Sequence, residues 1–133
     1  MLYKFKIVYL AYIFLCLSIL NAKNNQKFYI NDLIENNGQF FKKFKKVKVQ
    51  GFIFQKFKNT RNITSEKFIG EYRHNGKNGK WTRRWKNGNI KSSGYYKNSI
   101  KEGLWEEFNQ EGEKFYQLYY ENGIIVYIKN LNI

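Results

Sequence analysis

Residues 70–89 read GEYRHNGKNGKWTRRWKNGN, and residues 94–113 read GYYKNSIKEGLWEEFNQEGE. The two stretches lie 24 positions apart and share these residues: Gly70 and Gly94, Tyr72 and Tyr96, Lys77 and Lys101, Gly79 and Gly103, Trp81 and Trp105, and Gly88 and Gly112. The register continues into a third, partial unit at Tyr119, Tyr120, Asn122 and Ile124. A fixed period of this length indicates a repeat architecture, in which each unit packs on its neighbours.

Within each unit, turn residues alternate with runs of strand-forming residues. Asn-Gly pairs at 75–76, 87–88 and 122–123 predict tight hairpin turns, because both residues tolerate positive φ. The runs between them are rich in aromatic residues and Ile and alternate with the period of a pleated strand. Tyrosines at one phase of the repeat are expected to form an aromatic rib. The sequence therefore predicts an all-β fold, an elongated antiparallel sheet of successive β-hairpins with a 24-residue repeat.

The order Gly-x-Tyr, Asn-Gly-Lys-x-Gly-Lys-Trp and Asn-Gly resembles the variant form of the MORN-type (membrane occupation and recognition nexus) repeat. The resemblance covers residues 67–127 and rests on Gly-Lys-Trp at 79–81, Gly-Leu-Trp at 103–105 and the turn glycines. The sequence departs from the pattern at residues 99–100, where a turn pair is expected, and at Asn109, where an aromatic residue is usual. The resemblance implies a sheet of hairpins that acts as a scaffold or binding module. Some bacterial members carry an antitoxin label, which implies a partner-binding role.

The N-terminus has the pattern of a secretory signal. Lys4 and Lys6 precede an uncharged apolar run of 14 residues, 7–20, and Ala22 follows. This run is shorter than the roughly 20 residues that a membrane span needs. We expect cleavage after Ala22, so that residues 1–22 are a signal peptide and the protein is exported to the periplasm, the cell surface or the medium. Retention of the segment as a short anchor is the alternative.

The rest of the chain is expected to have two parts. Residues 23–44 form a lead-in, whose apolar spacing fits a short helix and an irregular segment equally well. Residues 45–133 form the hairpin-repeat domain. This domain is expected to begin with an atypical capping hairpin at 45–58 and a polar loop at 58–66, since terminal repeats often differ from the rest.

Charge is unevenly placed along the chain, whose formal net charge is +14. Residues 23–101 hold 20 Lys plus Arg and 4 acidic residues, whereas residues 102–133 hold 2 and 6. Basic clusters interleaved with aromatic residues favour an anionic partner. A solvated edge that prevents strand aggregation is the alternative interpretation. The candidate partner-binding residues are Trp85, Arg83, Arg84, Trp81, Lys42, Lys43, Lys45 and Lys46.

The tryptophans among these candidates differ in what the repeat requires of them. Trp81 and Trp105 occupy the same phase and are expected in the core. Trp85 has Asn109 as its counterpart, so the fold does not require a tryptophan there. Trp85 is therefore the better site candidate of the two in the first unit.

No residue pattern typical of an enzyme is present. The single cysteine, Cys16, lies in the apolar run, and the single histidine, His74, adjoins a predicted turn. This leaves neither a metal site nor a nucleophile with a base. The glycines follow the hairpin period and not a phosphate-binding signature. We therefore expect a non-catalytic protein with no cofactor and no metal.

The expected function is binding. Our first hypothesis is a protein-binding scaffold at the cell envelope, which uses the basic and aromatic surface. Electrostatic binding to anionic membrane lipid or an envelope polymer is an alternative, as is antitoxin-like neutralisation of a partner protein, which the resemblance alone implies. Nucleic acid is disfavoured because no recognised nucleic-acid module is visible and an exported protein seldom meets that ligand.

Overall fold

The protein is largely β-structure, preceded by one long helix. The computed structural model describes residues 2–24, 26–45, 47–58, 64–73 and 76–131. Helix α1 is Leu2–Asn24, and a 3-10 turn, η1, is Ile30–Asp32. The strands within these ranges are β1 (Lys27–Tyr29), β2 (Leu33–Asn36), β3 (Gln39–Lys42), β4 (Gly51–Lys58), β5 (Thr64–Arg73), β6 (Gly76–Arg84), β7 (Ile90–Lys97), β8 (Ile100–Phe108), β9 (Lys114–Glu121) and β10 (Ile124–Asn130).

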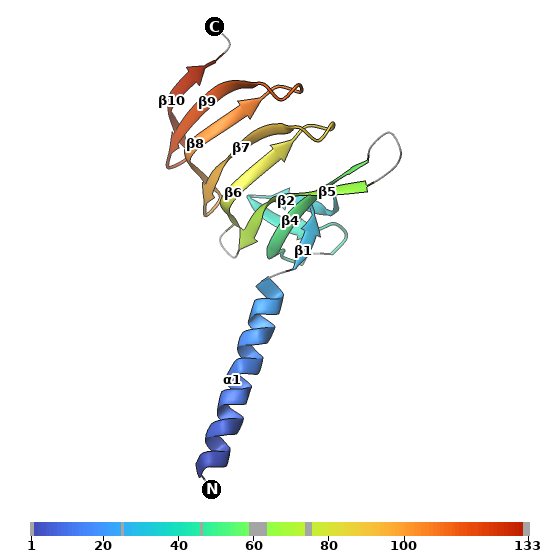
Figure 1. Cartoon of the computed structure of the whole chain (residues 1–133), viewed down its shortest axis with the longest axis vertical. Coiled ribbons are helices and arrows are strands. Elements are labelled where there is room, and N and C mark those ends of the chain that lie inside the picture. The colour runs from blue at the N-terminus through green and yellow to red at the C-terminus, as the bar shows by residue number, and fades with distance from the viewer. Residues whose placement is uncertain (1, 25, 46, 59–63, 74–75, 132–133) are drawn as a thin grey trace.

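Most of these strands form one elongated sheet in the order β1-β4-β5-β6-β7-β8-β9-β10 (Figure 1). From β4 onward each strand pairs antiparallel with the next strand along the chain, so the sheet grows by hairpins. This confirms the predicted all-β sheet. Its N-terminal edge differs from the prediction, because β1 pairs parallel with β4 and makes the sheet mixed. Strands β2 and β3 form a separate antiparallel hairpin.

The turns at one side of the sheet are tight and have positive φ at both central residues. Asn98 and Ser99 have φ values of 51° and 67°, and Asn122 and Gly123 have values of 50° and 81°. These are the values of type I′ turns. The departure from the repeat at residues 99–100 therefore leaves the hairpin unchanged, because Ser99 takes the turn position that Gly123 holds one unit later.

The turn between β6 and β7 is longer than predicted. Residues 85–89 form it, with the amide of Trp85 donating to the carbonyl of Asn89 at 2.9 Å and the amide of Gly88 donating to the carbonyl of Trp85 at 3.0 Å. Within this turn φ is positive only at Gly88, where it is 90°. The prediction of a two-residue type I′ turn at 87–88 is therefore wrong.

The first Asn-Gly pair, at 75–76, is also shifted relative to the predicted turn. Gly76 pairs with Arg73 as the first residue of β6, and the predicted turn residues His74 and Asn75 lie outside the described residues. Gly76 has a φ of 111°, and a Cβ there would lie 1.9 Å from Ser99 Oγ. Only glycine fits this contact between two adjacent units.

Two repeats each bury a tryptophan across the backbone of a glycine. Trp81 crosses Gly70 and Trp105 crosses Gly94, and a Cβ at these glycines would come within 2.4 Å and 2.2 Å of the indole. The indole N–H of each tryptophan also donates to a backbone oxygen of the preceding strand, at 3.1 Å in both cases. The repeated glycine and tryptophan are therefore two halves of one packing contact.

Buried and half-buried aromatic rings form a continuous ladder along the sheet. Ring centroids are 6.1 Å apart for Phe40 and Trp81, 6.1 Å for Trp81 and Tyr96, 5.0 Å for Tyr96 and Trp105, and 6.2 Å for Trp105 and Tyr120. Contacts of this kind contribute about 1 kcal/mol each beyond the burial of the rings. The ladder includes two tyrosines of the predicted rib, and the core tryptophans alternate with them.

The segment expected as a lead-in, residues 23–44, contributes to the same core as the repeats. Phe28, Leu33 and Phe40 are all buried, and Phe40 of β3 closes the N-terminal end of the aromatic ladder. Asn37 and Gly38, with φ values of 48° and 73°, make the turn between β2 and β3. The sequence was compatible with either a short helix or an irregular segment here. The structure instead has a strand, a 3-10 turn and a hairpin.

The first hairpin of the sheet is β4–β5 and not the predicted capping hairpin at 45–58. Strand β4 occupies the second half of that range by itself, and its antiparallel partner is β5. Before β4, Lys48 makes an isolated bridge to Phe41. The polar loop predicted at 58–66 overlaps the start of β5 at Thr64, and residues 59–63 lie outside the described residues.

Helix α1 lies apart from the core. It extends away from the sheet (Figure 1), and its described side chains are exposed or half-buried. Within the described part of the chain, no helix is both long enough and apolar enough to cross a membrane. The core cluster contains residues from β1 to β9 and none from α1.

We expect a chain that begins at Lys23 to be as stable as the full chain, because α1 adds no side chain to the core cluster. Near-UV circular dichroism reports on buried tryptophans, and its thermal midpoint should agree between the two chains within about 2 °C. A loss of many degrees on truncation would contradict this expectation and place α1 within the folded unit.

Candidate functional site

The candidate site is a groove at the position where β5 and β6 separate. These strands pair only at Glu71 with Asn78, Tyr72 with Lys77, and Arg73 with Gly76. One repeat later, β7 and β8 stay paired from Lys97 and Ile100 down to Ser92 and Glu107. The buried Ser92 and Ser93 of β7 correspond to Phe68 and Ile69 in β5. The groove thus interrupts the strand pairing of the repeat. It lies where the large apolar Phe68 and Ile69 stand in place of two serines.

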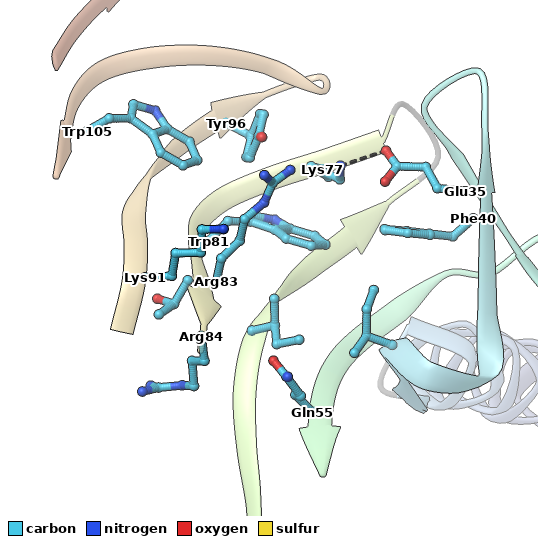
Figure 2. A pocket seen from close by; sticks show the side chains of 13 residues that line it. Glu35, Phe40, Gln55, Lys77, Trp81, Arg83, Arg84, Lys91, Tyr96 and Trp105 are labelled. Carbon is cyan, nitrogen blue, oxygen red and sulfur yellow. Dashed lines mark hydrogen bonds and ion pairs between the residues drawn. The ribbon is translucent and has the colours of Figure 1, made fainter. Parts of the chain in front are cut away.

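The groove has a volume of about 320 Å³ and joins two kinds of surface. Its base is apolar and aromatic, whereas Arg83, Arg84 and Lys91 come from the β6–β7 hairpin on one side (Figure 2). The full lining is Ile30, Glu35, Phe40, Gln55, Ile69, Lys77, Trp81, Thr82, Arg83, Arg84, Lys91, Tyr96 and Trp105. Such a site combines an apolar contact area with charges that orient a ligand.

The three cations on the β6–β7 side have no carboxylate partner within the described chain. Arg83 is exposed. Arg84 donates from Nη1 to the carbonyl of Gly88 at 3.2 Å, while its Nε is buried without an acceptor among the described residues. Burial lowers the pKa of the Arg84 guanidinium below its usual value. The Nζ of Lys91 lies 4.3 Å from the centroid of the Trp85 ring.

The cation at the base of the groove is neutralised within the protein. Lys77 is 8% exposed, and its Nζ lies 2.7 Å from Oε1 of Glu35 in β2 (Figure 2). The same Nζ is 5.3 to 5.6 Å from the ring centroids of Phe40, Trp81 and Tyr96. Burial raises the pKa of the Tyr96 hydroxyl, and the charge of Arg83 acts in the opposite direction. Lys77 therefore ties the β2–β3 hairpin to the aromatic ladder, and the charge left for a ligand is that of the three cations on the β6–β7 side.

The structure divides the predicted site residues between the groove, the core and the surface. Arg83 and Arg84 line the groove. Trp81 is 5% exposed and belongs to the core, so its part in a site is to form the base. Trp85 is half-buried, does not line the groove, and donates from Nε1 to the carbonyl of Phe108 at 3.0 Å. Trp85 thus joins two successive turns, and it contributes to the groove through its contact with Lys91.

The predicted lysine cluster lies on a different part of the surface. Lys42, the last residue of β3, is exposed, as are Lys43 and Lys45, which follow it, and all three line a separate hollow of about 430 Å³. Lys46 lies outside the described residues. The structure therefore does not bring these lysines to the groove.

Sequence reasoning missed Lys91, Glu35 and Phe40. The place of Lys91 follows from the hairpin through residues 85–89. In that hairpin Arg83 pairs with Ser92, and Lys91 is the residue before Ser92. Glu35 and Phe40 flank Asn37-Gly38, an Asn-Gly pair that indicates their hairpin. Nothing in the repeat indicates where that hairpin docks.

Among the described residues, no three His, Cys, Asp or Glu side chains gather closely enough to hold a metal ion. Comparison of the chain with models of protein families, with curated proteins and with solved structures gives no match.

Proposed function

We propose that this chain is an exported, non-catalytic β-repeat protein that acts as a binding scaffold at the cell envelope. Its partner is a protein that presents an acidic segment to the groove. The observation that carries the proposal is a set of three cations, Arg83, Arg84 and Lys91, that have no carboxylate partner among the described residues and lie beside an aromatic base. The basic and apolar start of the chain supports export, and the resemblance to MORN-type repeats supports a binding role.

The chemistry of the groove favours carboxylates beside apolar side chains. A guanidinium offers several N–H donors in a plane that matches a carboxylate, and the pairing strengthens where water is excluded. The aromatic base offers contact area to apolar side chains of the same segment. An acidic peptide with interspersed aromatic residues satisfies both surfaces, whereas a simple polyanion satisfies only the first.

Reversing the charge on the β6–β7 side should abolish this binding. We expect R83E combined with K91E to weaken the affinity for a short peptide of alternating Glu and Phe by about 100-fold. Two cations that attract the peptide carboxylates are replaced by two carboxylates that repel them. Fluorescence anisotropy with the labelled peptide and the chain from Lys23 measures the change. Both side chains are exposed, so the variant is expected to fold.

The matched control is K80E combined with K97E, which changes the net charge equally at exposed lysines that do not line the groove. We expect this control to lose less than about threefold in affinity, the effect of net charge alone. An equal loss in both variants would reduce the interaction to net charge and contradict the proposal. So would absence of peptide binding to the unmodified chain at low salt.

A further inference from the structure

A second surface, unrelated to the groove, has an unusual composition. The Phe44 loop, which we define as residues 42–45 and 47–48, begins at the last residue of β3 and leads toward β4. It carries Phe44, which is 100% exposed. Lys42, Lys43 and Lys45 flank it and are exposed too. Val47, further along the loop, is 53% exposed. A fully exposed aromatic ring therefore stands out from the domain between exposed lysines. Of these lysines, Lys43 donates from Nζ to the carbonyl of Asn31 at 2.5 Å, and the Nζ of Lys42 lies 5.2 Å from the centroid of the Phe28 ring.

The loop is an ordered turn whose backbone is unfavourable for phenylalanine. The amide of Lys43 donates to the carbonyl of Asp32 at 2.9 Å, and the amide of Lys45 donates to the carbonyl of Lys42 at 3.3 Å. Phe44 has a φ of 64°, in the left-handed region that disfavours bulky side chains. The fold thus gains neither burial nor a relaxed backbone from this ring, whereas glycine would suit the position.

The loop lies at the end of the domain from which α1 departs. Lys27, three residues after the end of α1 at Asn24, lines the same hollow as Phe44 and Lys45. Exposed apolar and basic groups therefore lie at this end of the molecule, where Lys27 is paired with Glu66 and Asp32 lines the same hollow.

We propose that the Phe44 loop docks the protein on an anionic lipid bilayer. The lysines meet the negatively charged headgroups, each contributing about a fivefold increase in affinity. The Phe44 ring enters the boundary between headgroups and acyl chains, where an aromatic side chain is stabilised. A soluble polyanion or an acidic protein surface would bind the lysines but would not require a fully exposed ring. The exposed ring therefore favours lipid as the partner.

Vesicle sedimentation with the chain from Lys23, whose core is complete without α1, tests the proposal. The probe is phosphatidylcholine vesicles with about 30 mol% phosphatidylglycerol at low salt, beside pure phosphatidylcholine. We expect binding to the anionic vesicles, weakened about tenfold by F44A because the inserted ring is lost. The triple substitution of Lys42, Lys43 and Lys45 by Gln should weaken binding about 100-fold.

Matched controls keep the chemistry of each change and move it elsewhere. L104A removes an apolar side chain that is 46% exposed on β8, and substitution of Lys80, Lys86 and Lys97 by Gln removes equal charge from other exposed positions. Both controls should bind anionic vesicles within about threefold of the unmodified chain. Equal losses in loop variants and controls would overturn the proposal, and so would undiminished binding by F44A.

F44G separates lipid binding from folding. Because glycine relaxes the left-handed backbone, we expect this variant to melt roughly 5 °C higher while its vesicle binding falls as in F44A. A variant that melts higher and binds as well as the unmodified chain would overturn the proposal. The groove plays no part in these measurements, since none of the altered loop residues lines it.

Discussion

G94A is expected to destabilise the domain by about 3 kcal/mol or more, the largest effect that we predict for a single added methyl group. A Cβ at Gly94 would lie 2.2 Å from Trp105 Cδ2, far inside the contact distance of two carbon atoms. The indole has little room to yield, because Trp105 is 2% exposed and is held between Tyr96 and Tyr120. Urea unfolding of the chain from Lys23, followed by tryptophan fluorescence, measures the loss.

G103A is the matched control for this prediction. Gly103 has open space where a Cβ would stand, but its φ is 66°. Alanine there should cost about 1 kcal/mol, through backbone strain alone. If G94A costs no more than G103A, the packing of tryptophan on glycine does not constrain the repeat as we describe.

The third unit has neither the glycine nor the tryptophan of this contact. Leu118 stands at the phase of Gly94, and Lys129 stands at the phase of Trp105. Leu118 is buried, and its strand partner is Trp105. A side chain at the glycine phase is thus accommodated in the unit that lacks a tryptophan to cross it.

E35K is expected to destabilise the domain by about 3 kcal/mol. The substitution replaces the ion pair of Glu35 and Lys77 by two cations, and the side chain of Lys77 is only 10% exposed. Most of the loss comes from leaving a buried ammonium group without a carboxylate. Because this pair ties the β2–β3 hairpin to the sheet, hydrogen exchange within β2 and β3 should accelerate more than exchange within β8 and β9.

A second substitution makes this prediction specific. K77M removes the buried charge and keeps much of the side-chain volume, so E35K combined with K77M should regain most of the lost stability. The measurement is again the urea midpoint of the chain from Lys23. A double variant as unstable as E35K alone would show that Glu35 acts through something other than its pairing with Lys77.

Three of the 13 residues that line the groove, Trp81, Arg83 and Arg84, were predicted from the sequence as site residues. Arg83 and Arg84 were identified because they lie in a basic and aromatic cluster within a readable strand. Trp85 was selected because the repeat does not require it, and the structure gives its indole N–H a partner in the next turn, the carbonyl of Phe108. Lys91 was missed because the turn between β6 and β7 is longer than the Asn-Gly pair predicts.

The sequence by itself determined the hairpin sheet, its 24-residue period and the placement of Trp81 and Trp105 in the core. These features follow from the alternation of side chains along each strand and from a contact that is repeated in successive units. The structure of one unit therefore predicts that of the next.

Only the tertiary structure decided that the β2–β3 hairpin covers the first unit and that β5 and β6 part to form a groove. Those features rest on single contacts between segments that are not repeated, such as the pairing of Glu35 with Lys77 across 42 residues of sequence. Contacts of that kind depend on how whole elements pack, and no periodic signal in the chain encodes them.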